Sequence, residues 1–231
     1  MLAKFLEDIG RFNKASLEYK EILKEEPKHT FAILFLANTL FREGKFKEAE
    51  KELKRTFSLE PPNKNTKANI LLALGNLYLQ QQRYKEAEAK LSEAFSLEPP
   101  NKNTKANILI SLGNLYLQQQ KHKEAEERLN EALSIEPQDK NIIISIHYAL
   151  GSLYRRKGDL EKTKERFEEV VKSAGVIKSL VNKNRFAGGA HFHLGTIYQR
   201  MGENKKANYH FKECLRLIPD HRKAKENLGE T

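Results

Sequence analysis

The sequence predicts an all-α protein built from repeated pairs of antiparallel helices. Residues 60–97 recur without gaps as residues 98–135, with nine substitutions in 38 positions. Apolar residues within the repeated segment follow a helical period rather than a strand period. All seven prolines lie just past a predicted second helix, where the missing N–H and the fixed φ stop helical continuation. These observations indicate a repeat of two helices, punctuated by proline.

Two helices are predicted within each copy of the repeated segment. The first covers residues 68–81, where Leu71, Leu74 and Tyr78 recur at i, i+3 and i+7. The second covers residues 84–97, and its apolar face is formed by Tyr84, Ala87, Leu91 and Ala94. A tight turn joins the two helices.

Weaker copies of this unit flank the two nearly identical ones. A small residue follows each inter-helix turn, at spacings of 34, 38, 38, 38 and 44: Ala15, Ala49, Ala87, Ala125, Thr163 and Ala207. We therefore expect a single domain, 1–231, of six repeats with the first one shortened, followed by a capping helix. The expected segments are 1–29, 30–67, 68–105, 106–143, 144–187, 188–220 and 221–231.

The fifth repeat carries an insertion of about ten residues. Residues 172–190 include the apolar run "VIKSLV" and end in Gly188 and Gly189. Paired glycines at a helix start favour flexibility or a close approach of the backbone. A structural insertion, in the form of a hinge or an extended helix end, and a partner-contacting loop are the alternatives.

Composition excludes several classes of protein. The 231 residues are 39% apolar and 31% charged, and no run approaches eighteen apolar residues, so we expect no membrane insertion. The N-terminus lacks the apolar stretch of a signal peptide. The single cysteine, Cys214, excludes an internal disulfide and favours a reducing compartment, so we expect a cytoplasmic location. The net charge of +10 favours acidic partners without choosing among peptide, nucleic acid and lipid.

No motif supports catalysis or metal binding. The seven histidines are scattered, and His191 and His193 point to different helix faces, so they do not form an i, i+4 chelating pair. Phosphate-binding loops, nucleophile elbows and H-E-x-x-H helices are missing from the sequence. We therefore expect that the protein is not an enzyme and that it binds no cofactor and no metal ion. His147, His191 and Cys214 are expected to be packing residues.

The repeats resemble the tetratricopeptide repeat (TPR) family. The pattern L-G-x-x-Y, then alanine, then a large apolar residue and proline occurs at Leu74, Gly75, Tyr78, Ala87, Leu91 and Pro99. It recurs at Leu112, Gly113, Tyr116, Ala125, Leu129 and Pro137, and at Leu194, Gly195, Tyr198, Ala207, Phe211 and Pro219. The resemblance covers essentially the whole chain. It implies a right-handed superhelical solenoid whose first helices line a concave wall, and a function in protein binding. The early tryptophan of the family is absent here.

Gly75 and Asn76 stand in mid-helix, where each lowers helix propensity. The glycine is next to a core leucine, where the lack of a side chain lets the second helix approach closely. The same explanation covers Gly113, Gly151 and Gly195, with Ala3 and Ala37 in the first two repeats. The asparagine belongs to one narrow polar strip of the predicted helix, formed by Asn69, Ala73, Asn76 and Gln80.

Short polar residues occupy the position of Asn76 in five repeats and would form a ladder on the concave wall. These residues are Asn38, Asn76, Asn114, Ser152 and Thr196. An amide donates and accepts, so a column of amides can pair with the backbone of an extended peptide. The apolar neighbours expected to contact the peptide are Leu34, Leu72, Ile110, Tyr148 and Phe192. The strip position one helical turn further along each first helix is occupied by Arg42, Gln80, Gln118, Arg156 and Arg200. Alternatively, the asparagines are merely tolerated on an exposed face.

Arginines refine the expected partner. Arg155, Arg156 and Arg200 lie on the inner side of the last two repeats, with no acid at the matching strip positions. We therefore expect a protein-protein interaction scaffold that binds an extended, acidic segment of another protein. Family members that bind chaperones clamp a carboxylate with lysines, but Leu34, Leu72 and Ile110 stand at those positions, so that partner is not implied.

A basic nucleic-acid-binding array is the alternative function. The loops between repeats align lysines along one edge as a ridge: Lys64, Lys67, Lys102, Lys105 and Lys140. The ridge lacks interleaved aromatic residues for base stacking, which argues against nucleic acid. A solvated edge explains the lysines equally well.

The two ends of the array differ. The first repeat begins in mid-helix, with Leu2 and Leu6 on a face that a preceding repeat would normally cover. We therefore expect the chain to be a fragment, able to self-associate through this N-terminal helix. Residues 221–231 supply a polar closing helix at the other end.

Overall fold

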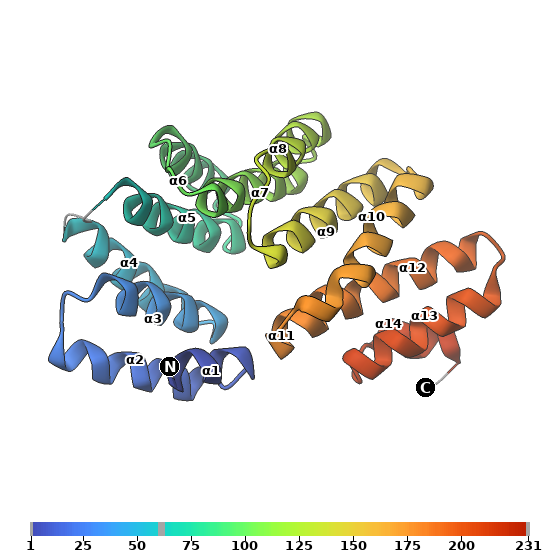
Figure 1. The fold of residues 1–231 in the computed structure, drawn as a ribbon, viewed down its shortest axis with the longest axis horizontal. Helices are drawn as coiled ribbons and strands as arrows, with labels where there is room; N and C mark the ends of the chain where they lie inside the picture. The colour runs from blue at the N-terminus through green and yellow to red at the C-terminus, as the bar shows by residue number, and fades with distance from the viewer. Residues whose placement is uncertain (1, 60–62, 230–231) are drawn as a thin grey trace. The chain divides into compact units, whose positions relative to one another are not determined.

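The computed structural model describes residues 2–59 and 63–229, and all of their regular secondary structure is helical. The chain forms two compact units, residues 1–136 and 137–231, coloured blue to green and yellow to red in Figure 1. The first unit contains α1 (Leu2–Asp8), α2 (Phe12–Glu25), α3 (Thr30–Arg42), α4 (Phe46–Ser58), α5 (Lys64–Gln80), α6 (Tyr84–Ser96), α7 (Lys102–Gln118) and α8 (His122–Ser134). The second contains α9 (Lys140–Lys157), α10 (Leu160–Ser173), the 3₁₀ turn η1 (Ala174–Val176), α11 (Leu180–Lys183), the π-helical η2 (Asn184–Gly188), α12 (Gly189–Arg200), α13 (Asn204–Leu217) and α14 (Arg222–Leu228).

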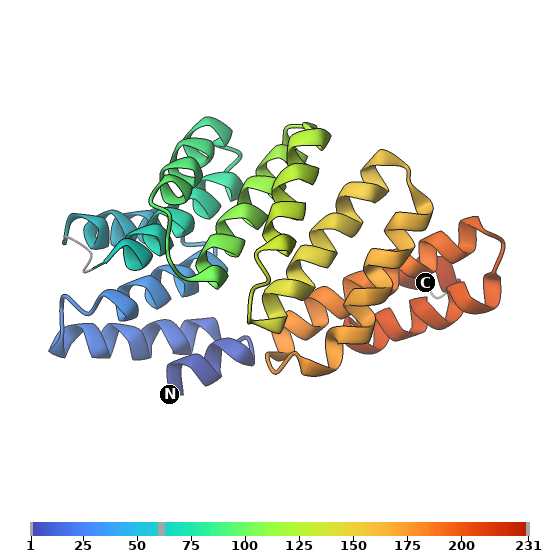
Figure 2. The same cartoon turned by 45° about the horizontal axis from the view of Figure 1, so that its top comes forward.

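Within each unit the helices form antiparallel pairs, which Figure 2 shows most clearly for α7 with α8 and for α9 with α10. The first helices of the pairs are α1, α3, α5, α7, α9 and α12. The second helices are α2, α4, α6, α8, α10 and α13. The prediction of an all-α array of antiparallel helix pairs is therefore confirmed. The prediction of a single domain, and of its repeat boundaries, stays a prediction.

Contact between the two helices of a pair depends on the mid-helix glycine. A Cβ atom added to Gly113 would lie 2.7 Å from Cγ of Leu129, well inside normal contact distance. Gly113 is buried, and the Leu129 side chain is fully buried. The same relation recurs in four repeats: Gly75 with Leu91, Gly113 with Leu129, Gly151 with Phe167, and Gly195 with Phe211. The predicted packing role of the glycine is confirmed.

The turn between paired helices requires one residue in the left-handed backbone conformation, with a positive φ. Glycine supplies it at Gly44, where φ is +77°, and at three other turns. In the two duplicated repeats the same position is Gln82, with φ of +59°, and Gln120, with φ of +61°. The hydrogen bonds of the turn are nevertheless alike, since Lys45 N donates to Leu40 O at 2.9 Å and Arg83 N donates to Tyr78 O at 2.9 Å. The turn geometry is therefore kept without glycine.

The insertion at 172–190 lengthens the first helix of the last repeat. After η1, residues 180–200 are continuously helical through α11, η2 and α12. Both paired glycines have helical φ values, −61° at Gly188 and −63° at Gly189. A Cβ added to Gly188 would lie 2.6 Å from Cδ1 of Ile218, and one added to Gly189 would lie 2.5 Å from Oη of Tyr148. Close approach, rather than a hinge, explains the pair.

The first helix leaves apolar side chains exposed. Leu2 is 55% exposed and Phe5 is 59% exposed, whereas the residues one repeat later, Leu36 and Thr39, are buried. Leu6, which was expected on the same open face, is buried in the core instead. At the other end, Ala224 of the predicted closing helix α14 is buried in the core of the second unit.

Replacing Gly113 with leucine should destabilise the N-terminal unit by roughly 1 to 3 kcal/mol, because the new side chain overpacks the contact with Leu129. Chemical denaturation monitored by circular dichroism measures the change. Gln118→Leu, at an exposed position of the same helix, is the control and should change stability by less than about 0.5 kcal/mol. Equal stability of the Gly113 variant and the wild type would show that the contact is not tight.

Candidate functional site

The polar strip lies on the open side of the first helices in the N-terminal unit. Asn38 is exposed, and Asn76 and Asn114 are half-buried. Their neighbours on the opposite side, such as Leu74 and Leu112, are buried in the helix-pair core. Helices α3, α5 and α7 contact one another in order, so the three asparagines belong to adjacent helices of one unit.

Two phenylalanines that were not predicted as site residues belong to the same strip. Phe31 is 57% exposed and Phe35 is 39% exposed, at the positions that Asn69 and Ala73 occupy one repeat later. The ring of Phe35 stacks on Tyr19, with ring centroids 5.7 Å apart. The signal was present in the sequence, because a spacing of 38 residues aligns Phe31 with Asn69.

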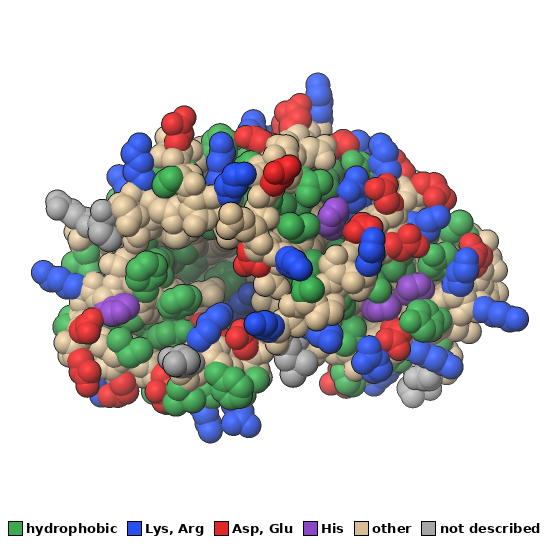
Figure 3. All heavy atoms as spheres, viewed as in Figure 1, with side chains coloured by type: hydrophobic (Ala, Val, Ile, Leu, Met, Phe, Trp, Pro, Cys, Tyr) green, Lys and Arg blue, Asp and Glu red, His purple; other side chains and the backbone are tan. Residues whose placement is uncertain are grey.

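A pocket of about 490 Å³ opens at the N-terminal end of this strip. Figure 3 shows a hollow in the surface of the N-terminal unit. The lining residues come from the starts of α3 and α5 and from the loop before α7: Phe31, Asn63, Lys64, Asn65, Thr66, Asn69, Pro100 and Asn101. The volume is within the range of small-ligand pockets, which is about 300–1,000 Å³.

The apolar neighbours of the strip are less open than expected. Leu34 and Leu72 are half-buried and pack against the core. Ile110, in the same register, is only 8% exposed. Ile110 therefore offers almost no contact area to a ligand, in contrast to the expectation from its position.

The C-terminal unit presents a different surface at the same register. The hydroxyl of Ser152 donates to the Tyr148 carbonyl at 2.9 Å, and that of Thr196 donates to the Phe192 carbonyl at 3.0 Å. Each hydroxyl proton is thus used within its own helix. Ser152 and Thr196 can therefore still accept a hydrogen bond from a ligand. Unlike the asparagines, they have no hydroxyl or amide proton left to donate to it.

Tyr148 and Phe192 are half-buried and pack against other aromatic rings. The ring of Tyr148 lies edge-on to Phe167 and Phe186, at centroid distances of 5.5 and 5.4 Å. The ring of Phe192 lies 4.4 Å from that of His221. Both side chains pack against the core of the second unit, which the sequence position alone did not reveal.

The remaining predicted site residues are exposed. They are Arg42, Gln80 and Gln118 in the N-terminal unit and Arg155, Arg156 and Arg200 in the C-terminal unit. The last-turn positions of α9 and α12 hold the arginines, where cations are favourable to the helix dipole.

Comparison with sequence families places these repeats. Two profiles of the tetratricopeptide repeat match the chain, one over residues 29–98 and 66–138, the other over residues 144–175 and 188–221. The chain belongs to the tetratricopeptide repeat family. TPR proteins act as protein-protein interaction scaffolds and are generally not enzymatic. No match is found among curated proteins.

Solved structures share the fold. PilW, a widely conserved type IV pilus biogenesis factor, superposes with a TM-score of 0.71 at 18% identity, over 98% of this chain and 95% of PilW. BtubC from P. vanneervenii gives 0.68 at 19% identity, over 92% and 90% of the two chains. The pilF protein of Pseudomonas aeruginosa gives 0.66 at 18% identity, over 100% and 95%. At sequence identities of 18–19%, the similarity to these proteins shows a shared fold and nothing about function.

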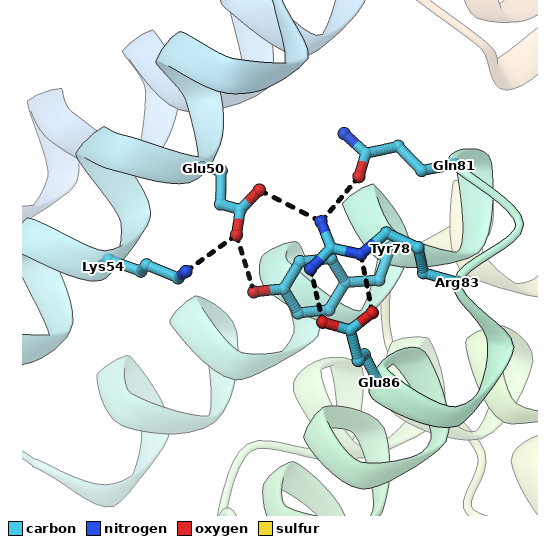
Figure 4. Close-up of polar contacts among 6 residues, drawn as sticks. All are labelled: Glu50, Lys54, Tyr78, Gln81, Arg83 and Glu86. Carbon is cyan, nitrogen blue, oxygen red and sulfur yellow. Dashed lines mark hydrogen bonds and ion pairs between the residues drawn. The ribbon is translucent and has the colours of Figure 1, made fainter.

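A tyrosine-glutamate hydrogen bond joins neighbouring repeats at three places in the chain. The hydroxyl of Tyr78 in α5 donates to Oε1 of Glu50 in α4 at 3.1 Å (Figure 4). Lys54 and Arg83 also reach this carboxylate, at 2.8 and 3.2 Å. The Arg83 guanidinium lies over the Tyr78 ring, 4.2 Å from its centroid. The bond recurs between Tyr116 and Glu88 and between Tyr198 and Glu168.

The ionisation of Glu50 follows from these contacts. Burial opposes the charged form, but the hydrogen bonds from Lys54, Tyr78 and Arg83 outweigh it and lower the pKa of Glu50. A lowered pKa means that the carboxylate contributes stability above its unfolded pKa of about 4.3, and that this contribution is lost as pH falls through the folded pKa.

Three further ionisable side chains, His191, His210 and Cys214, are wholly or partly buried in the C-terminal unit. Nδ1 of His191 lies 2.9 Å from Nδ1 of His210, and burial together with His191 lowers the pKa of His210 to about 4. Burial raises the pKa of the Cys214 thiol to about 11, which disfavours the reactive thiolate. No group of three or more potential metal ligands, and no helix suited to span a membrane, occurs in residues 2–59 and 63–229.

Replacing Glu50 with glutamine should lower stability by about 1 kcal/mol at pH 7 and remove part of the stability loss below about pH 4.5. Urea denaturation at pH 7 and pH 3.5 measures both effects. Glu48→Gln, at an exposed position of the same helix, is the matched control. A Glu50 variant with the pH dependence of the wild type would show that the contacts do not hold the carboxylate ionised.

Proposed function

We propose that this TPR chain is an interaction scaffold whose first helices bind an extended, acidic segment of a partner protein. The observation that carries the proposal is the alignment of Asn38, Asn76 and Asn114 on the open side of three adjacent helices. Each residue of an extended segment presents a backbone donor and acceptor. An amide pairs with both, so the three side chains hold the backbone whatever the partner's side chains are.

The charge of the strip favours an acidic segment. The strip positions of α3, α5 and α7 carry no carboxylate and one cation: Phe31, Phe35, Asn38, Arg42, Asn69, Ala73, Asn76, Gln80, Asn107, Ser111, Asn114 and Gln118. In the C-terminal unit, Arg155 and Arg200 are exposed and always charged. The net charge of +10 adds a general attraction for acidic groups.

The contacts of two lysines of the basic ridge do not favour the nucleic-acid alternative. Nζ of Lys67 lies over the ring of Phe57, 5.3 Å from its centroid, and Nζ of Lys105 lies over Phe95 at 5.5 Å. These lysines cover aromatic rings of the preceding second helix. Such contacts support a structural role for two members of the ridge over a phosphate-binding one.

The double variant Asn76→Ala, Asn114→Ala should bind the partner about tenfold or more weakly, since each lost amide contact costs about 1 kcal/mol. Partners are first isolated by affinity capture with nuclease treatment, and their affinity is then measured by calorimetry. Helicity and melting temperature should stay nearly unchanged, because these side chains do not enter the core. The control is Asn130→Ala, at an exposed position of the second helix α8. Full affinity of the double variant would refute the proposed binding face.

Reversing Arg155 and Arg200 to glutamate should weaken the same complex, and more so at low salt, because screening reduces exposed charge interactions. Calorimetry at about 50 and 300 mM salt separates this effect from a change in folding. The matched control is Lys205→Glu, Lys212→Glu, which makes the same charge change at exposed positions of α13. Equal losses in both variants would indicate a net-charge effect and not a role of the two arginines.

A further inference from the structure

The pocket at the start of the strip has an aromatic wall that is open to solvent. Phe31 lines it and is 57% exposed, although the residues in its register one and two repeats later, Asn69 and Asn107, are polar. Pro100 forms a second apolar wall. A ligand ring that covers Phe31 removes apolar surface from water and gains the offset or edge-on ring contact that aromatic side chains prefer.

Two of the asparagines that line the pocket, Asn63 and Asn101, present hydrogen-bond donors. Oδ1 of Asn63 accepts from Thr66 N at 2.9 Å, and Oδ1 of Asn101 accepts from Thr104 N at 3.1 Å. Both asparagines cap helices, so their carboxamide oxygens are engaged. Their NH₂ groups are therefore the main hydrogen-bonding capacity that they offer to a ligand.

The electrostatic character of the pocket is positive. Lys64 lines it and is exposed, and none of the eight lining residues is acidic. Neither α5 nor α7 carries an acidic residue in its first turn to offset the positive end of its helix dipole. An anionic group next to the pocket is thus favoured by Lys64, by the amide donors and by the helix ends together.

We infer that this pocket binds an aromatic side chain of the partner segment, with acidic residues directly beside it. The inference rests on the proposed function and deepens it, because it names the residues that the bound segment carries. The volume of about 490 Å³ lies within the range of about 300–1,000 Å³ for small-ligand pockets, which is ample for one aromatic ring. The ring lies against Phe31 and Pro100, and the carboxylates lie at the rim beside Lys64.

Three capped tripeptides test the inference without knowledge of the natural partner: acetyl-Asp-Phe-Asp-amide, acetyl-Asp-Ala-Asp-amide and acetyl-Lys-Phe-Lys-amide. Each is titrated into the isotopically labelled full chain, and binding is followed through the backbone amide resonances of residues 31, 63–69 and 101. The first peptide should shift these resonances with a Kd about tenfold lower than either of the others. Equal binding of the alanine peptide would overturn the aromatic anchor, and equal binding of the lysine peptide would overturn the acidic preference.

Two phenylalanine variants provide the matched comparison. Phe31→Ala should weaken the first tripeptide about tenfold, to the level of the alanine peptide. Phe5→Ala removes a side chain that is equally exposed, at 59%, on α1 of the same unit and should leave the affinity unchanged. Both variants should keep the melting temperature of the wild type because neither ring is buried. An unchanged affinity of Phe31→Ala, or an equal loss in both variants, would show that the pocket is not the site.

The same variants separate this inference from the function on which it rests. If Asn76→Ala, Asn114→Ala weakens the natural complex while Phe31→Ala weakens neither that complex nor the tripeptide, the anchor pocket is refuted and the peptide-binding strip stands. If Phe31→Ala weakens the tripeptide while the asparagine pair leaves the natural complex at full affinity, the pocket stands and the strip is refuted.

Discussion

The contact of a large apolar side chain with a bare glycine backbone is the constraint on which the rest of each repeat depends. Leu129 lies so close to Gly113 that any side chain there would meet it, and Phe211 lies equally close to Gly195. This contact sets the distance between the paired helices and also their rotation. Once the glycine faces the second helix, the residue that follows it is turned towards the open side. The position of the polar strip is therefore a geometric consequence of the packing.

A second regular contact fixes one repeat against the next. Tyr78 and Tyr116 each extend a hydroxyl to a glutamate of the preceding second helix, and a cation covers each ring. The partly buried carboxylate is compensated by several donors, which is the condition for a polar group at an interface to be tolerated. Because the bond repeats in register, the strip residues of neighbouring first helices are held in register too.

The five short polar residues at equivalent positions of the first helices differ in their chemistry. Asn76 and Asn114 present amides, whereas Ser152 and Thr196 donate their only protons to their own helices. The N-terminal unit also has the exposed ring of Phe31 and the adjacent pocket. The amides and the exposed ring thus belong to the N-terminal unit, whereas the C-terminal unit has exposed arginines at the ends of α9 and α12.

The sequence by itself determined the helix pairs, the role of the glycines and the register of the strip. These depend on local periodicity and on a repeat that occurs twice almost unchanged, so Gly113, Asn114 and Leu129 could be assigned by alignment alone. Only the tertiary structure decided which strip residues are available. Ile110 and Leu72 share a register, yet Ile110 is buried and Leu72 is half-buried, while Tyr148 and Phe192 are held by rings from other helices. Exposure and pocket shape depend on neighbours that are distant in the chain, and a helical projection contains no information about them.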